Sequence, residues 1–538
     1  MSSASPADTT TAPKRDTFSS RRVFILAAIG SAVGLGNIWR FPYIAYENGG
    51  GAFMIPYVVA LLFAGLPFLF FDYALGHKFR GSAPLSMARL HPKAEWLGWW
   101  QVAVCMVIAV YYAVILAWAV MYVGFSVDHR WGNDPKNFFF GDFLHVANDV
   151  SVGTDFVPGV LIPLIVIWIV VIGIMALGVN KGIGKLSLIF IPLLVVAFVM
   201  LVVQAVLLPG AAQGLEAFFT PNWSALADGK VWMSAIGQIF FSLSVGFGIM
   251  ITYASYVDRK TDMTKSGLVV GFANSSFELL AGIGVFAALG FMAQATSVPV
   301  GEVVSNGIGL AFVAFPTIIS EAPGGTLLGI LFFLSLIMAG LTSLVSVLEV
   351  GVSAFREKLG LGRVAGTVVM CVPIAIVSCF FFSTTTGLYV LDTVDAFLNS
   401  FGILAVAMVS MVVLTWAFKA LPALKTHLNR HGSFPIGRLW MGIIGGLLPL
   451  ALLALLLQDL GKQLAQPYEG YPQSFINIFG WGMVIALPII AIGLSLLPWS
   501  KTVRLSPQRT EESATDDAWT DATQREPAAD AHRRDEGR

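Results

Sequence analysis

Two runs of small and polar residues interrupt stretches that are otherwise apolar. Residues 30–37 read GSAVGLGN, and residues 242–248 read SLSVGFG. Glycine in a helix interior costs about 1 kcal/mol relative to alanine, so each run predicts a break in a helix. Close helix packing through the spacing of Gly30 and Gly34 is the alternative for the first run. A break frees main-chain N–H groups, which suit a carboxylate, and carbonyls, which suit a hard cation such as Na⁺. The two runs therefore predict binding sites for an anionic group and for cations.

The composition places these runs in a membrane. Of the 538 residues, 56% are hydrophobic and 12% are charged, whereas soluble chains carry about 25% charged residues. The mean hydropathy is +0.77. The formal net charge is zero, so the chain lacks the basic surface that binds nucleic acid. These values exclude a soluble enzyme, a disordered chain and a nucleic-acid-binding protein, and they make the lipid bilayer the main partner.

Long apolar runs predict the membrane-spanning helices, each of which needs about 20 mostly apolar residues. The sequence predicts twelve, at residues 22–45, 52–77, 97–127, 159–179, 185–208, 231–256, 266–295, 325–355, 364–383, 388–417, 436–457 and 474–499. The runs are continuous and do not alternate, which excludes a membrane β-barrel. Residues 302–322, with two glutamates and a proline, are predicted to form an outer loop with short helices.

The basic residues predict the orientation of these helices. Of the 32 Lys and Arg residues, 27 fall on one side of the alternation, four fall on the other, and Arg40 lies inside a span. Because positive charge collects in cytoplasmic loops, both termini are predicted to lie in the cytoplasm. The chain then divides into a cytoplasmic amino-terminal segment, two sets of five helices, two further helices and a disordered tail, at residues 1–21, 22–208, 231–417, 436–499 and 505–538.

The broken helices are the first members of the two five-helix sets. Paired interrupted helices at corresponding positions indicate the binding site of a transporter. Signs of catalysis are absent from the sequence, because no histidine lies in the middle of an apolar run and no GxSxG motif occurs. Cys105, Cys371 and Cys379 lie in apolar runs without metal-ligand spacing. An intramembrane enzyme is therefore disfavoured.

At the two breaks the chain resembles the neurotransmitter:sodium symporter family, specifically its bacterial amino-acid branch. The resemblance covers residues 15–500 and rests on GSAVGLGNIWRFPYIAYENGGGAFMIPY at 30–57, QIFFSLSVGFGIMITYASY at 238–256 and AGLTSLVS at 339–346. It implies an all-α membrane protein of twelve helices, with helices 1–5 and 6–10 as an inverted repeat and helices 1 and 6 unwound. It also implies a substrate and two Na⁺ ions near the bilayer midplane.

The resemblance implies two sodium sites made of neutral oxygens. The first would use the Ala32 carbonyl and the side chains of Asn37, Ser242 and Asn274, and the substrate carboxylate would complete it. The second would use the carbonyls of Gly30, Val33 and Ala339 and the hydroxyls of Thr342 and Ser343. Neutral oxygens suit a releasable monovalent cation, whereas Ca²⁺ would call for clustered carboxylates.

The resemblance also implies how a substrate binds. Its carboxylate would meet the amides of Leu35 and Gly36 and the hydroxyl of Tyr112, and its amine would meet the carbonyls of Ala32, Phe241 and Ser242 and the hydroxyl of Ser244. The side-chain pocket would consist of Ser31, Ile108, Phe241, Phe247, Ser343 and Val347. Monoamine members carry Asp at the position of Gly34, so a glycine there implies that the substrate brings its own carboxylate. A neutral, hydrophobic α-amino acid is expected.

Several charged residues lie inside or beside the spans. Chloride-dependent members carry Ser at the position of Glu278, so the resemblance implies transport without chloride; a protonated packing residue is the alternative. Arg40 with Asp395 matches the outer gate and Arg15 with Glu357 the inner gate, although a static ion pair would also satisfy Arg40. Three further acids are expected to be hydrogen-bonded structural groups, with the first bonded to an unwound segment: Asp72, Glu349 and Asp392.

These expectations combine into one function. The chain is expected to be a sodium-coupled secondary active symporter of the cell membrane that imports a small neutral amino acid by alternating access and does not catalyse a reaction. A sodium-dependent amino-acid sensor and an ion channel on the same scaffold are the alternatives. The sequence leaves open which amino acid is preferred and whether the chain forms a homodimer.

Overall fold

All regular elements in the part of the chain that the structure describes are helices. The computed structural model describes residues 16–304 and 307–505. Within them the only extended pairings are isolated bridges, between Gly50 and Pro221 and between Phe156 and Thr384. Arg15 and the tail beyond residue 505 lie outside the described residues. The predicted all-α architecture is confirmed.

Ten helices in the described residues are long and apolar enough to cross a membrane. They are Gly51–Phe79 (with α3 Met54–Ala60 and α4 Leu66–Phe79), Pro92–Asp128 (α6 Glu95–Asp128), α8 Pro158–Ala176, Val179–Val206 (α9 Lys185–Val206), α13 Met263–Thr296, α17 Gly325–Leu359, α18 Arg363–Phe382, Gly387–Ala417 (α19 Gly387–Phe397 and α20 Leu404–Val412), Arg438–Gly470 (α22 Arg438–Gly442 and α23 Leu448–Ala465) and Gln473–Ser495 (α24 Gln473–Ile476 and α25 Met483–Ser495). Each overlaps one predicted span.

The first predicted span is a pair of helices, α1 Arg21–Ala32 and α2 Leu35–Glu47, bent by 54° at Val33 and Gly34. The sixth is also divided, into α11 Gly229–Ser242 and α12 Ile249–Ala254. Between them Ser244, Gly246 and Gly248 have φ of 53°, 87° and 91°, a region that glycine enters without steric cost. Both predicted breaks are confirmed. The described residues contain ten helices long enough to span a membrane, and the bent pair α1 and α2 makes an eleventh span. Neither half of the sixth predicted span is long enough to cross a membrane by itself. The count of twelve spans therefore stays a prediction.

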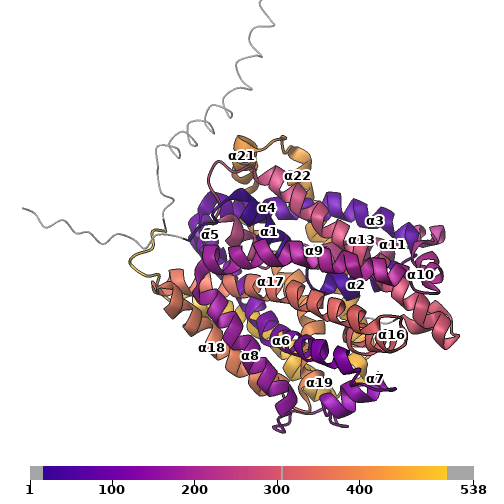
Figure 1. Ribbon diagram of the computed structural model, residues 1–538. Coiled ribbons are helices and arrows are strands. Elements are labelled where there is room, and N and C mark those ends of the chain that lie inside the picture. Colours follow the sequence, from indigo (N-terminus) through magenta and orange to yellow (C-terminus); the bar gives the residue numbers. More distant parts are fainter. Residues whose placement is uncertain (1–15, 305–306, 506–538) are drawn as a thin grey trace, which may run out of the picture.

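Short helices mark the two ends of the bundle. In Figure 1, α5 Ala83–Leu90 and α21 Leu421–His431 lie at one end, and α7 Pro135–Asn137, α10 Ala211–Phe219 and α16 Phe315–Glu321 lie at the opposite end. This separation agrees with the side assigned to each loop from its charges. In the predicted outer loop, α14 Val300–Val303, α15 Gly307–Gly309 and α16 are short, as expected.

Burial distinguishes the central helices from the peripheral ones. In the most apolar stretch of α17, 78% of the residues are buried, against 28% in α8 and in Gln473–Ser495. Large apolar side chains such as Ile162, Ile376 and Ile489 are more than half exposed on the outer helices. A helix that is apolar on its exposed side requires an apolar surrounding. The core therefore lies along α17, and the outer helices present a surface suited to lipid.

Two histidines link α4 to α21. His77 Nδ1 lies 2.9 Å from His427 Nε2, and His77 Nε2 lies 2.8 Å from the Asp258 carbonyl oxygen. The carbonyl can only accept, so His77 carries its proton on Nε2 and accepts from His427 through Nδ1. Burial, reinforced by His77, Lys78, His431 and Arg430, lowers the pKa of His427 well below 6.5.

We expect this pair to make the fold sensitive to acid. Below about pH 6.5 the unfolded chain takes up a proton that folded His427 refuses, so stability falls by up to about 1.4 kcal/mol per pH unit. Between pH 7.5 and pH 5.5 the unfolding temperature of the wild type should therefore drop more than that of His427→Gln. Exposed His145→Asn should behave like the wild type. An equal drop in His427→Gln would contradict this assignment.

Candidate functional site

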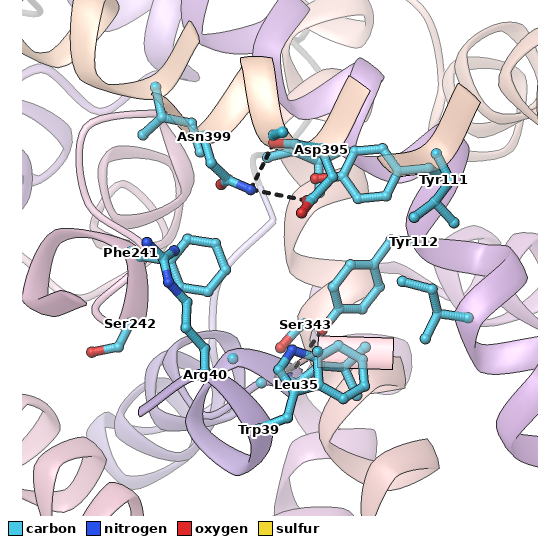
Figure 2. Close-up of a pocket in the computed structure, with 18 of the residues that line it drawn as sticks. Leu35, Trp39, Arg40, Tyr111, Tyr112, Phe241, Ser242, Ser343, Asp395 and Asn399 are labelled. Atoms are coloured by element: carbon cyan, nitrogen blue, oxygen red, sulfur yellow. Dashed lines mark hydrogen bonds between the residues drawn. The ribbon is translucent and has the colours of Figure 1, made fainter. Parts of the chain in front are cut away.

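A cavity of about 620 Å³ lies between the two broken helices. Its walls come from both breaks and from α6, α17 and α19, and Figure 2 shows residues of these walls facing one another. All the residues predicted to contact substrate line it: Ser31, Ala32, Gly34, Leu35, Gly36, Ile108, Tyr112, Phe241, Ser242, Ser244, Phe247, Ser343 and Val347. The fold thus gathers residues that the sequence spreads over more than 300 positions.

One end of the cavity is formed by the N-terminus of α2. The Leu35 N–H donates to the Tyr112 hydroxyl over 3.4 Å, so the amide and the hydroxyl share a position that an anion could occupy. A methyl group on Gly34 would lie 3.0 Å from Ser343 Oγ and 3.3 Å from Tyr112 Oη. Glycine at 34 therefore keeps space open between these hydroxyls. Nearby, Ser244 Oγ donates to the Ser31 carbonyl over 3.0 Å, which ties the two broken helices together.

The side chains of the first predicted sodium site form one hydrogen-bonded chain. Asn37 Nδ2 donates to Asn274 Oδ1 over 2.8 Å, and Asn274 Nδ2 donates to Ser242 Oγ over 2.9 Å. Asn37 Oδ1 accepts from the Gly34 N–H over 2.9 Å. Ala32, Asn37 and Ser242 also line the cavity. These contacts bring α2, α11 and α13 together beside the substrate position.

Two carbonyls of the second predicted sodium site face Ser343. Ser343 Oγ lies 3.3 Å from the Gly30 carbonyl oxygen and 3.5 Å from that of Val33. One residue earlier in α17, Thr342 Oγ1 lies 2.9 Å from the Ala339 carbonyl oxygen. Among the described residues no group of three or more His, Cys, Asp or Glu could hold a metal ion. The oxygen set is therefore neutral and fits a weakly bound monovalent cation.

Glu278 is completely buried in α13. Its carboxylate accepts from the Tyr57 hydroxyl and, over 2.7 Å, from Gln238 Nε2. Tyr57 also contacts Ser275 Oγ over 2.9 Å. Glu278 thus lies among neutral hydrogen-bond donors one helical turn from Asn274.

Asp72 in α4 bonds an unwound segment, as predicted. It is fully buried, and its Oδ2 accepts from the Gly246 N–H over 3.0 Å. Glu349 receives two hydrogen bonds from Arg363 and one from Tyr256, while Asp392 receives one each from Tyr468 and Tyr471. The three acids are hydrogen-bonded, which confirms the prediction.

We expect Asp72→Ala to destabilise the unwound segment of the sixth span. The Gly246 N–H would lose its acceptor at a buried position, which costs about 1–3 kcal/mol. The unfolding temperature of the purified protein should fall and uptake should slow. Asp72→Asn keeps an acceptor oxygen and should retain most of the stability. A stable Asp72→Ala variant would contradict a supporting role for this carboxylate.

The two residues of the predicted outer gate line the same cavity but are not joined. The Arg40 guanidinium carbon lies 4.5 Å from the centre of the Phe241 ring, and Asp395 accepts from Asn399 (Figure 2). Among the described residues, no ion pair connects Arg40 to Asp395. The cavity continues past both to Gly309 and Glu469, in loops predicted to face outside. The two predicted gate residues therefore do not close the cavity in this structure.

The amino-terminal segment packs against α1 and against the end of α12. Phe18 is buried against the rings of Phe24, Tyr253 and Tyr256, and its N–H donates to the Tyr256 carbonyl over 3.1 Å. Phe18 therefore anchors the amino-terminal segment to the helix bundle.

The structure describes one of the two residues of the predicted inner gate. Arg15 lies outside the described residues, and Glu357 accepts from the Ser82 N–H over 2.9 Å. The sequence reasoning missed Asp16, which lies 2.5 Å from Arg356 and 3.5 Å from Arg363. Opposite charges at neighbouring span ends were the only available signal, because these residues are about 340 positions apart in the chain.

A ring of apolar helices around a cavity between two broken helices defines a membrane transporter. A family model described as the Sodium:neurotransmitter symporter family matches residues 15–137 and 131–502. The chain belongs to this family of transporters.

Relatives of known sequence or structure agree with this membership. An uncharacterized sodium-dependent transporter of Methanocaldococcus jannaschii is 39% identical over 492 residues, which span 91% of this chain and 99% of the relative. The sodium- and chloride-dependent glycine transporter 2 of Xenopus laevis is 29% identical, over 91% of this chain and 71% of the relative. The crystal structure of MhsT in complex with L-phenylalanine matches with a TM-score of 0.70 and 32% identity, over 82% of this chain and 99% of that one. The chain is thus similar to sodium-dependent transporters along most of its length.

Proposed function

We propose that the protein imports a neutral, hydrophobic α-amino acid together with two Na⁺ ions, by alternating access and independently of chloride. It would act in the cell membrane with both termini in the cytoplasm. The observation that carries this proposal is the cavity between the two broken helices, which is lined by the N-terminus of α2, by apolar side chains and by residues of both predicted sodium sites, namely Ala32, Asn37 and Ser242 of the first and Ser343 of the second.

The lining of the cavity supports an α-amino acid. The free N-terminus of α2 offers N–H groups to a carboxylate, and Gly34 supplies no charge of its own. The charged lining residues, Arg40, Asp392, Asp395 and Glu469, lie toward the mouth. Ile108, Phe247 and Val347 make the deeper wall apolar, which favours a hydrophobic side chain. That a related structure contains L-phenylalanine supports the same class.

Two Na⁺ ions would supply enough free energy for accumulation. Each charge moving inward gains about 2.3 kcal/mol per 100 mV, and a tenfold Na⁺ gradient adds roughly 1.4 kcal/mol per ion. Two ions at about 100 mV thus provide roughly 7 kcal/mol, enough for an accumulation on the order of 10⁵-fold at the limit.

Uptake into liposomes that contain the purified protein tests the proposal. Under an inward Na⁺ gradient, each of the twenty amino acids is offered in radioactive form. We expect accumulation of one or more neutral, apolar amino acids, and loss of accumulation when K⁺ replaces Na⁺ or an ionophore dissipates the gradient. Uptake that ignores Na⁺, or a substrate-independent ion current, would contradict the proposal. Binding without transport would indicate a sensor.

A further inference from the structure

Asn399 holds the acid of the outer gate. Its Nδ2 donates to Asp395 Oδ1 over 2.9 Å and lies the same distance from the Asp395 main-chain oxygen (Figure 2). Both side chains are half-buried and line the cavity. A hydrogen bond to a carboxylate is charge-assisted and stronger than one between neutral groups. The Asp395 carboxylate is therefore restrained by its own helix, in addition to its hydrogen bond with the Tyr111 side chain of α6.

Asn399 follows Asp395 by four residues, the spacing at which two side chains lie on the same face of a helix. Residues Leu398–Ile403 form a wide, π-type turn between α19 and α20. Such turns change the direction in which side chains project and occur frequently at functional sites. Here Asp395, Asn399 and Ser400 all line the cavity. The amide is thus placed at the mouth of the cavity, beside the gate acid.

Arg40 is held separately, on the other side of the mouth. Its guanidinium rests over the Phe241 ring, with the carbon 4.5 Å from the ring centre. Figure 2 shows Arg40 and Phe241 facing Asp395 and Asn399 across the cavity. Closing the gate would bring the arginine to the acid, so Arg40 must leave the Phe241 ring and the Asp395 carboxylate must turn away from the position in which Asn399 and Tyr111 hold it.

We propose that Asn399 is a positioning residue of the outer gate, which stabilises the open arrangement by competing with Arg40 for Asp395. This inference rests on the alternating access of the proposed function and on the predicted gate of Arg40 and Asp395, and it adds a residue that sets the balance between the open and closed gate. Without the amide, Asp395 loses an interaction of the open state but none of the closed state. The ratio of open to closed molecules should then fall roughly tenfold, as for the loss of one hydrogen bond to a charged group.

Labelling of a cysteine beneath the gate tests this without any transport. Ile108→Cys places a thiol in the cavity wall below Arg40 and Asp395, and a membrane-impermeant thiol reagent is applied from outside in Na⁺ without substrate. The same protein without the added cysteine provides the blank. We expect labelling of Asn399→Ala to be about tenfold slower than that of the parent. Ser400→Ala, a neighbouring change in the same cavity wall, should label at the parent rate.

An Arg40→Ala background separates positioning from general disruption. With no arginine to meet, Asp395 cannot close the gate, so Asn399→Ala should no longer slow labelling. A single symmetric peak in size-exclusion chromatography and an unfolding temperature close to that of the parent show that each variant is folded. Unchanged or faster labelling of Asn399→Ala, or slowing that persists without Arg40, would overturn the inference. Because the assay needs neither substrate nor uptake, a wrong substrate assignment would leave its result unaffected.

Discussion

Replacing Glu278 by serine is expected to make uptake depend on chloride. The carboxylate is fully buried and accepts hydrogen bonds from Tyr57 and Gln238. Its negative charge would balance the cations that enter the neighbouring sites. Removing a buried partner charge costs about 3–5 kcal/mol, so uptake by Glu278→Ser without chloride should fall roughly 100- to several thousand-fold. Added chloride can take the vacated space beside the same donors and should restore uptake.

The measurement compares initial rates of uptake in chloride and in gluconate. The wild type should transport equally in both. Glu278→Gln removes the charge but keeps the volume of the side chain, so its uptake should be low in both media. Full activity of Glu278→Ser in gluconate would show that no fixed negative charge is needed, and Glu278 would then be a packing residue.

Hydropathy predicted the helices well because lipid contact demands long apolar runs. The expected span 325–355 became α17 Gly325–Leu359, and 388–417 became Gly387–Ala417. The method failed where a helix continues beyond the apolar region. The span expected at 436–457 reaches Gly470, past Asp459 and Lys462, because hydropathy marks the apolar run and not the helix end.

Part of the candidate site could be predicted from residue types alone, and part only from the resemblance to a family. Glycine and polar residues at 30–37 and 242–248 predicted the breaks, because such residues are costly in an apolar helix. The partners around the breaks came from resemblance to a family, since spacing alone cannot bring Ser343 to Gly30. The Asn399 bond to Asp395 was not predicted, although the spacing of four residues gave a signal for it. The pair of His77 and His427 escaped prediction because 350 positions separate its members.

The second sodium site gives the other large expected effect. Thr342→Val should raise the Na⁺ concentration for half-maximal uptake about 10- to 100-fold, the equivalent of losing one interaction of about 1.5–3 kcal/mol with a charged group. Valine has nearly the shape of threonine, so α17 should pack as before. Thr342 is buried and does not line the substrate cavity, which separates its effect from substrate binding.

Ser335→Ala is the matched control for this change. Ser335 is buried in the same helix and donates to the Leu331 carbonyl over 2.7 Å, much as Thr342 donates to the Met338 carbonyl over 3.0 Å. Loss of such an intrahelical bond should leave the Na⁺ dependence unchanged, so a rise confined to Thr342→Val must come from a lost ion ligand. Direct binding of radioactive Na⁺ should fall from two ions per protein toward one at the concentration that saturates the wild type. Equal Na⁺ dependence in both variants would mean that the Thr342 hydroxyl does not bind the ion. The oxygens around Ser343 would then hold the ion without a ligand from Thr342.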